Sequence, residues 1–161
     1  MKHVTQASSA EAMKPQGCTN FKLRQLMRRV AQYYDAELVK AGLKVTQYSL
    51  LSYVLKLGPI RPGALAQAMK MDASTLTRNL KPLVEAGWLA LGAGSDGRSR
   101  LVSITESGRE KRHEAQRRWR VAQDGLNQQL GIERVLALHT LIDDALELLS
   151  PIEPGVDDDP Y

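Results

Sequence analysis

Apolar residues recur every three or four positions in four stretches of the chain, the spacing that places them on one face of a helix. These stretches predict helices over residues 18–41, 47–57, 105–129 and 132–149. The first helix carries one apolar stripe, formed by Leu23, Met27, Val30, Tyr34, Leu38 and Ala41. The last is apolar on two sides, formed by Val135, Leu138, Ile142, Leu146 and Leu149 and, beside them, by Leu136, Leu141, Ala145 and Leu148. A helix with two apolar sides requires two partners.

Capping residues and helix breakers set the ends of these helices. Gly42 is predicted to end the first, and Thr46 to cap the second, which Gly58-Pro59 stops. Thr105 caps the third, which at about 1.5 Å per residue spans roughly 37 Å, more than a small domain covers. We therefore predict that the first and last helices bury their apolar faces against a second copy of the chain, in a two-fold dimer. A helical bundle within one chain is the alternative.

The middle of the chain combines two short helices with two short strands. In order, these elements are predicted over Arg61–Met69, Ala73–Ala86, Trp88–Leu91 and Leu101–Ile104. Pro62 suits the first turn of the helix over Arg61–Met69. Asp72 caps the helix over Ala73–Ala86, and Gly87 closes that helix. A turn rich in Gly, Ser and Asp joins the strands. Helix, turn, helix and β-hairpin in this order predict a winged helix-turn-helix, with the second helix as the recognition helix.

The predicted fold class is therefore mainly α with a small β-hairpin wing (α+β), a winged helix-turn-helix with long N- and C-terminal dimerisation helices. The predicted organisation is a flexible N-terminal arm (1–17), a dimerisation helix (18–44), a winged helix-turn-helix DNA-binding domain (45–104), dimerisation helices (105–150) and a disordered acidic tail (151–161).

Charge is distributed unevenly along the 161 residues, whose net charge is +4. Residues 1–132 hold 21 Lys and Arg against 10 Asp and Glu, a net charge of +11, whereas residues 133–161 hold one against eight, a net charge of −7. This pattern suits a protein that attracts a phosphate backbone over one surface, although a solvated surface with an acidic end produces it too. The single cysteine, Cys18, fits a reducing compartment. Because no run of eighteen apolar residues and no signal-peptide pattern is present, a soluble cytoplasmic protein without a membrane partner is predicted.

The predicted recognition helix is rich in side chains that bond base edges and phosphates in a major groove, namely Ser74, Thr75, Thr77, Arg78, Asn79 and Lys81. Arg78 is the best candidate for guanine and Asn79 for adenine, whereas Ser74 and Thr75 could instead serve only to start the helix. Pro82 is predicted to kink this helix. In the wing, Asp96 could pair with Arg98 while Arg98 or Arg100 enters a minor groove. Arg61 and Lys56 are weaker candidates for phosphate contacts.

Patterns of enzyme and cofactor sites are absent or incomplete. Gly92–Gly97 matches GxGxxG, but a strand follows it where a dinucleotide site needs a helix. His113-Glu114 begins like HExxH, but Arg117 stands where the second histidine belongs. The three histidines and Cys18 are scattered. We predict no catalytic residue, no metal site, no cofactor and no enzymatic activity. A protein-docking module without specific DNA binding is an alternative, because winged helices also serve that role.

In this order of elements the sequence resembles the MarR family of winged-helix transcription regulators, over about residues 18–150. The residues that carry the resemblance are Leu43–Leu51, Asp72–Leu80, Asp96-Gly97-Arg98 and Ile104–Gly108. The resemblance implies an obligate homodimer whose terminal helices interlock and which binds a pseudo-palindromic operator in double-stranded DNA. It also implies repression that is relieved by a small ligand or by oxidation.

Two sensors are compatible with this resemblance. Cys18 lies near the position where relatives that sense organic peroxides carry their reactive cysteine, although it falls about two residues early; a lone cysteine can equally be a small apolar residue. The other sensor is a pocket for a small aromatic or carboxylate effector between the dimerisation helices and the winged helix. Its candidate lining residues are Phe21, Arg24, Arg28, Tyr33, Tyr48 and Trp119. Surface arginines and core aromatic residues are the alternative interpretation of this set.

Overall fold

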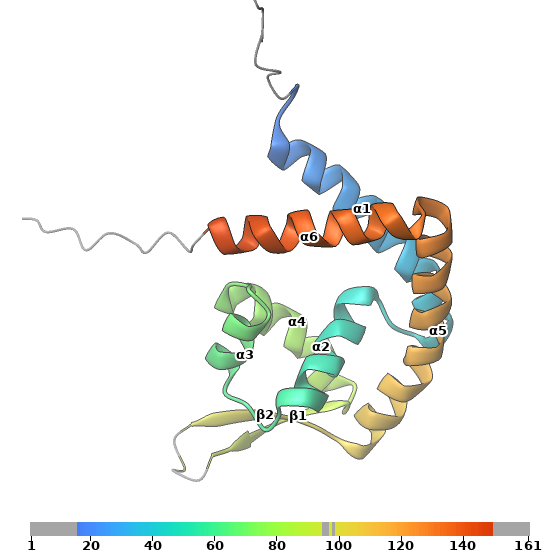
Figure 1. Ribbon diagram of the computed structural model, residues 1–161. Coiled ribbons are helices and arrows are strands. Elements are labelled where there is room, and N and C mark those ends of the chain that lie inside the picture. The colour runs from blue at the N-terminus through green and yellow to red at the C-terminus, as the bar shows by residue number, and fades with distance from the viewer. Residues whose placement is uncertain (1–15, 95–96, 98, 150–161) are drawn as a thin grey trace, which may run out of the picture.

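A computed structural model describes residues 16–94, 97 and 99–149 of the chain. Within them the elements are, in order, α1 (Thr19–Leu38), a 3-10 turn η1 (Val39–Ala41), α2 (Val45–Leu57), α3 (Pro62–Ala68), α4 (Ala73–Glu85), the strands β1 (Leu89–Ala93) and β2 (Arg100–Ile104), α5 (Glu106–Leu130) and α6 (Ile132–Leu148). Figure 1 shows α2, α3, α4 and the hairpin gathered in one lobe, with α5 running along its side towards α6. This arrangement confirms the predicted fold class, a winged helix-turn-helix with long terminal helices.

The hairpin that forms the wing is anchored to the helices at its base. β1 and β2 pair antiparallel, with Leu89 opposite Ile104 and Ala93 opposite Arg100. Val102 is also bonded to the loop between α2 and α3: Ile60 donates its N–H to the Val102 carbonyl at 3.0 Å and accepts the Val102 N–H at 2.8 Å. These backbone bonds fix the hairpin relative to α3 and α4.

The core of the lobe lies between α2, α3, α4 and the hairpin. α4 turns Leu76, Leu80 and Leu83 towards it, at spacings of four and three residues that keep them on one side of the helix. They share this core with Leu50, Leu51, Val54, Leu65, Leu89 and Val102. Full burial of each such side chain stabilises the folded protein by about 1.5–3 kcal/mol. The three leucines therefore decide which face of α4 is left at the surface.

Pro82 lies inside α4 and does not end it. Because proline has no N–H, the carbonyl of Arg78 lacks its intrahelical donor. The helix nevertheless closes its next turn, since the N–H of Ala86 donates to the Pro82 carbonyl at 3.0 Å.

The start of α2 differs from the sequence prediction, in which Thr46 caps a helix beginning at Gln47. The helix begins at Val45, and Thr46 lies within its first turn. The N–H of Val45 donates to Asp35 Oδ1 at 2.7 Å, and the N–H of Lys44 donates to Gln47 Oε1 at 2.9 Å. The prediction was wrong because Asp35, ten residues away on α1, supplies an acceptor that a local pattern does not show.

The apolar stripe of α1 is buried only in its second half. Tyr34, Leu38 and Ala41 pack into the core with Ala115 and Ala122 of α5. The Tyr34 hydroxyl donates to Gln123 Oε1 of α5 at 2.5 Å, and burial raises the pKa of this tyrosine. In the first half, by contrast, the side chains of Leu23 and Met27 are exposed, the latter by 63%.

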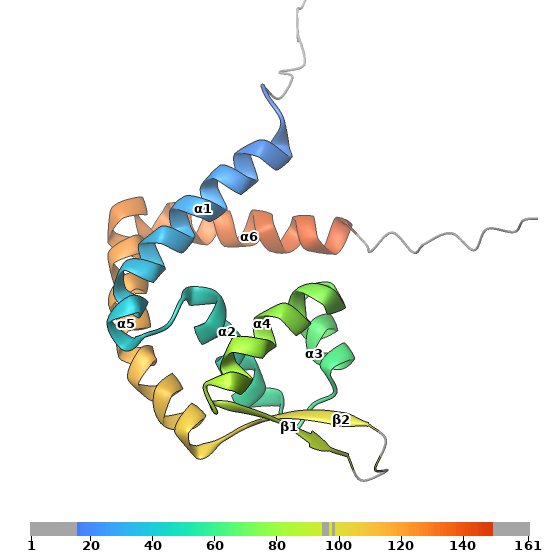
Figure 2. The same ribbon diagram turned by 180° about the vertical axis from the view of Figure 1, so that it is seen from behind.

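α6 buries little of its apolar surface within the chain. Figures 1 and 2 show it turning away from the end of α5 and extending as a single helix. Of its residues only Val135 is buried, and Leu138 is half-buried. Its other large apolar side chains are exposed, namely Ile132, Leu136, Leu141, Ile142, Leu146 and Leu148, as is Leu149 directly after it. The single chain therefore does not form the intrachain bundle that was the alternative to a dimer.

The first turn of α5 lies against the entry to β1 with no room for a side chain at Gly108. A Cβ on Gly108 would collide with the carbonyl oxygen of Trp88 and lie 2.9 Å from Ile104 Cγ1. Thr105 holds the same junction, since its Oγ1 donates to the Gly87 carbonyl at 2.6 Å and accepts the Gly108 N–H at 3.0 Å. The close approach links the wing to α5.

We expect Gly108→Ala to lower the free energy of unfolding by about 1–3 kcal/mol, because the backbone must shift to admit the methyl group. Urea unfolding measures this loss. Gly63→Ala is the matched control: its Cβ would meet nothing within 4 Å and lies in α3, where alanine favours the helix by up to about 1 kcal/mol. Equal stability of Gly108→Ala and the unmodified protein would contradict the close packing.

Candidate nucleic-acid interface

α4 presents a polar face to solvent, on the side opposite its buried leucines. Ser74, Thr77, Arg78 and Lys81 are exposed, and Thr75 and Asn79 are half-buried. All six residues predicted for the recognition helix therefore lie at or near one surface. The buried leucines of α4 orient the helix so that this surface faces solvent.

Asp72 begins this helix and engages the first two of the six. Its Oδ1 accepts the Ser74 hydroxyl at 2.6 Å and the Thr75 N–H at 2.7 Å, and its Oδ2 accepts the Thr75 hydroxyl at 2.7 Å. Ser74 and Thr75 thus help to start the helix, the alternative raised for them above. Their hydroxyl protons would have to leave Asp72 before donating to DNA, although their oxygens can still accept a hydrogen bond.

The same bonds make the cap sensitive to pH. Donation by Ser74, and then by Thr75, holds the pKa of the Asp72 carboxyl well below its usual range. Because the folded-state pKa is lowered, this contribution to stability is present above the unfolded pKa of about 3.9 and is lost as pH falls towards the folded value. We expect Asp72→Ala to lower the thermal unfolding midpoint at neutral pH, with the difference from the unmodified protein shrinking below about pH 4. A difference that is the same at every pH would contradict this.

The next turn of α4 holds the side chains best suited to contact bases. Thr77 donates its hydroxyl to the Ala73 carbonyl at 2.9 Å, which commits that proton to the helix backbone. One terminal nitrogen of Arg78 donates to Thr75 Oγ1 at 3.4 Å, which is a long hydrogen bond. Lys81 lies 3.8 Å from Glu85 in an exposed pair, which is a weak interaction in water. Neither contact ties up Arg78 or Lys81 strongly.

The start of α2 lies beside α4 and adds polar residues that the sequence analysis missed. Together the two helices border a hollow of about 250 Å³, lined by Lys44, Thr46, Gln47, Arg78, Asn79 and Pro82. A lysine at a helix N-terminus favours an anion such as phosphate. Lys44 before an expected helix was the available signal, but only the fold shows that this end faces α4.

The hairpin and the start of α3 carry the remaining DNA-binding candidates. Arg100 is exposed at the first position of β2, opposite Ala93. Arg61 is exposed at the N-cap position of α3. Gly97 has a φ of +66°, which suits the turn predicted there. Asp96 and Arg98, for which a pair was predicted, lie outside the described residues.

The six candidate effector residues are not gathered in one place. Phe21, Arg24 and Arg28 are exposed on the first half of α1. Tyr33 lines a hollow of about 460 Å³ between α1 and α5. Tyr48 is buried, and its ring stacks on that of Trp119 with centroids 6.0 Å apart. In this structure Tyr48 and Trp119 therefore pack as core aromatic residues, the alternative raised for them above.

Other chemistry is limited over the described part of the chain. Cys18 is exposed at the N-cap of α1, where its side chain makes no capping bond. Within residues 16–94, 97 and 99–149, no group of three or more His, Cys, Asp and Glu is placed to hold a metal ion. Among the same residues, no helix has both the length and the apolar character needed to span a membrane.

Sequence comparison gives the same family as the order of elements. Residues 41–99 match the MarR family. The HTH-type transcriptional regulator YwoH of Bacillus subtilis is 30% identical over 92 residues, which are 57% of this chain and 67% of that protein. The HTH-type regulator YxaD of the same organism is 34% identical over 92 residues, which are 56% of this chain and 64% of that protein.

Solved structures extend the similarity to most of the fold. The M. tuberculosis transcriptional regulator MosR in complex with DNA is 28% identical, with a TM-score of 0.67 over 80% of this chain and 98% of that chain. A probable transcriptional regulator from Pseudomonas aeruginosa is 26% identical, with a TM-score of 0.72 over 80% of this chain and 96% of that chain. E. coli MarR with operator DNA, at 20% identity and a TM-score of 0.72, shares the fold. The chain belongs to the MarR family of winged-helix transcription regulators.

Proposed function

We propose that the protein is a homodimeric repressor that binds a pseudo-palindromic operator in double-stranded DNA, and that a small aromatic or carboxylate effector relieves the repression. The observation that carries the proposal is the polar face of α4, which the buried leucines hold at the surface next to an anchored hairpin. α4 would enter the major groove, and the hairpin would reach an adjacent minor groove.

Charge and similarity support DNA as the partner. Residues 1–132 hold 21 Lys and Arg against 10 Asp and Glu, and Arg61, Arg78, Lys81 and Arg100 are all exposed. MosR, which resembles this chain over most of its length, has been solved in complex with DNA.

The exposed apolar surface of α1 and α6 supports a dimer. Obligate dimers bury about 2,000–5,000 Å² of mostly apolar surface, and the uncovered side chains of these two helices offer a surface of that character. Two copies related by a two-fold axis would present two recognition helices to half-sites about one DNA turn, ~34 Å, apart.

Oxidation of Cys18 is a second candidate for the signal, because its thiol is exposed at the start of α1. Cys18→Ser separates the two candidates. A repressor that peroxide releases from DNA through Cys18 loses that response in the variant, whereas an effector response persists.

Salt dependence tests DNA binding directly. We expect the affinity for a mixed pool of duplex DNA to fall steeply between about 50 and 200 mM salt, by about 10³–10⁵ for six to ten phosphate contacts. Fluorescence anisotropy with labelled duplexes measures it. An affinity that is negligible at low salt, or independent of salt, would support the protein-docking module instead.

A further inference from the structure

Residues 150–161, the acidic segment, follow α6 and lie outside the described residues. They contain no lysine or arginine and four acids, namely Glu153, Asp157, Asp158 and Asp159. The proposed DNA interface on α2, α4 and the hairpin carries the opposite charge at exposed positions, namely Lys44, Arg78, Lys81 and Arg100. The same chain therefore carries both a run of carboxylates and the cations that a phosphate backbone would meet.

The hollow between the start of α2 and α4 brings two of these cations to one place. Lys44 and Arg78 both line it, and none of its described lining residues is acidic. Among the described residues, neither cation forms an ion pair. Lys44 also lies at the N-cap of α2, where the helix dipole disfavours a positive charge. An anion in this hollow would balance the charge of both side chains.

A second basic hollow, between η1 and α5, suits an acidic segment less well. Lys40, Arg117 and Arg118 line it, but so does Glu114. Glu37 also pairs with Lys40 at 2.6 Å. The cations of this hollow therefore already face carboxylates.

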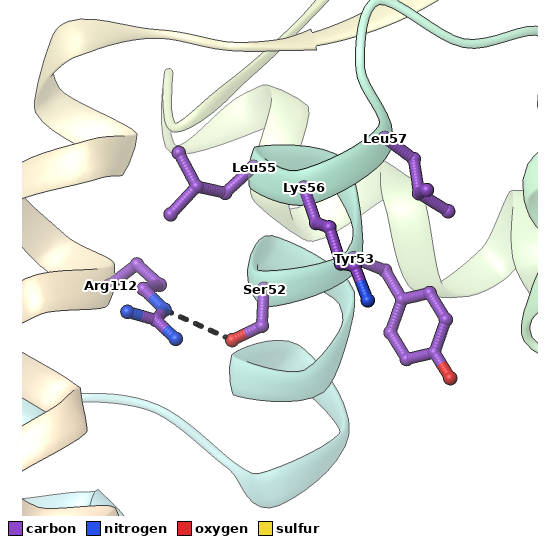
Figure 3. Close-up of a pocket in the computed structure, with 6 residues that line it drawn as sticks. All are labelled: Ser52, Tyr53, Leu55, Lys56, Leu57 and Arg112. Atoms are coloured by element: carbon purple, nitrogen blue, oxygen red, sulfur yellow. Dashed lines mark hydrogen bonds between the residues drawn. The ribbon is translucent and has the colours of Figure 1, made fainter.

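A groove between α2 and α5 is basic but has apolar walls. Its lining residues, drawn in Figure 3, are Ser52, Tyr53, Leu55, Lys56, Leu57 and Arg112. Arg112 already donates to Ser52 Oγ at 3.1 Å and to Gln116 Oε1 at 2.9 Å. A run of aspartates has little apolar surface with which to cover the leucines of this groove. The hollow with Lys44 and Arg78 is the better match for such a run.

The acidic segment is long enough to reach that hollow. Asp159 is ten residues beyond Leu149, so an extended chain can span up to about 35 Å between them. A domain of about 60 residues, the size of the winged helix, has a radius of gyration of roughly 10 Å. Figures 1 and 2 show the end of α6 on the same side of α5 as α3 and α4. A segment tethered in this way has an effective concentration of the order of millimolar, so weak charge pairing suffices to dock it.

We propose that the acidic segment docks on the surface formed by α2 and α4 of its own chain, with Asp157, Asp158 and Asp159 against Lys44 and Arg78, and competes there with the phosphates of DNA. Docking lowers the fraction of protein that is free to bind DNA, and the apparent affinity for DNA falls by the same factor. This competition rests on the proposed function, whereas docking itself does not.

Paramagnetic relaxation measured by NMR tests docking in the full chain without DNA. A nitroxide spin label at Pro160→Cys, in a Cys18→Ser background, is expected to weaken the amide signals of residues 44–47 and 78–81 at low salt. About 1 M salt should restore these signals, because the Debye length is then only about 3 Å. Signal loss that is absent, centred on other residues or unaffected by salt would overturn the inference.

Neutralising the aspartates separates docking from net charge. With residues 157–159 changed from Asp to Asn, the signals of residues 44–47 and 78–81 should stay strong at low salt. The matched control removes three negative charges from exposed residues of α5 and α6, through Glu110→Gln, Asp124→Asn and Glu133→Gln. It should keep the signal loss of the unmodified chain. The same response in both variants would overturn the inference.

Lys44→Gln and Arg78→Gln test the surface that receives the segment. Each should lower the salt concentration at which the weakened amide signals recover. Lys22→Gln is the control, because Lys22 is an exposed lysine in the first turn of another helix, α1. It should leave this salt concentration unchanged. A salt concentration that neither Lys44→Gln nor Arg78→Gln lowers would overturn the inference.

DNA affinity tests the competition and keeps the two proposals distinct. At about 50 mM salt, the variant neutralised at residues 157–159 should bind duplex DNA about 3- to 30-fold more tightly than the matched control, as a docked fraction of roughly 0.7–0.97 requires. Equal affinities would overturn the competition. A protein that binds DNA without docking of the segment overturns this inference alone, and a protein whose segment docks but which binds no DNA overturns the proposed function alone.

Discussion

Leu141→Asp is expected to convert the protein to a monomer and to lower its affinity for a two-site operator by about 10²–10⁴, the range of avidity lost when linked sites separate. Leu141 is 67% exposed in the single chain and belongs to the second of the two apolar sides of α6. In the proposed dimer its side chain is buried, and an unpaired carboxylate in an apolar interface costs far more than lost packing alone. Sedimentation velocity measures the oligomeric state, and anisotropy the affinity.

Thr140→Asp is the matched control, because it adds the same charge one residue earlier. Thr140 lies on the polar side of α6, one turn from Asp143 and Asp144. We expect this variant to stay dimeric and to bind DNA with nearly unchanged affinity. A dimeric Leu141→Asp protein would show that α6 does not form the interface.

Arg78→Ala is expected to weaken operator binding by about 1–3 kcal/mol, roughly 5- to 150-fold, and to relax the base preference at one position of each half-site. Arg78 is exposed on the second turn of α4, and its described contact there is the long bond to Thr75. An arginine so placed can direct two donors at the edge of a guanine.

Lys81→Ala separates base contacts from phosphate contacts on the same face of α4. Lys81 is one turn further along and is exposed. Its loss should weaken binding to all DNA sequences alike. It should also reduce the slope of log affinity against log salt concentration by about one. If Arg78→Ala lowers affinity equally for operator and unrelated DNA, Arg78 contacts the backbone and the proposed base contact is wrong.

The winged helix could be predicted from the sequence because its signals are local. α4 is indicated by Asp72 as its cap, by apolar residues spaced four and three positions apart, and by Gly87 after its end. The hairpin is indicated by two short apolar runs on either side of a glycine-rich turn. In the same way the two apolar sides of α6 indicated a helix that one chain cannot cover.

Contacts between distant parts of the chain could not be predicted. Asp35 sets the start of α2, ten residues away, and Ser52 fixes Arg112 from sixty residues away. In the sequence Arg112 is one of several arginines along α5. Only the fold separates it from Arg117 and Arg120, which are exposed.

The aromatic candidates show the same limit. Tyr48 and Trp119 are compatible with either a ligand pocket or a core, since both settings favour large rings. Their stack, at 6.0 Å between centroids, depends on how α2 packs against α5, which no periodicity reveals.

The most direct test of DNA recognition by a dimer is selection of bound fragments from a pool of promoter-proximal DNA of the source organism, followed by sequencing. The predicted result is enrichment of a two-fold-symmetric site with half-site centres about one DNA turn apart, roughly 16–20 base pairs in all, and loss of this enrichment in Leu141→Asp. Retention without any shared motif, or a motif without two-fold symmetry, would contradict the proposal that two copies of α4 read a pseudo-palindromic operator.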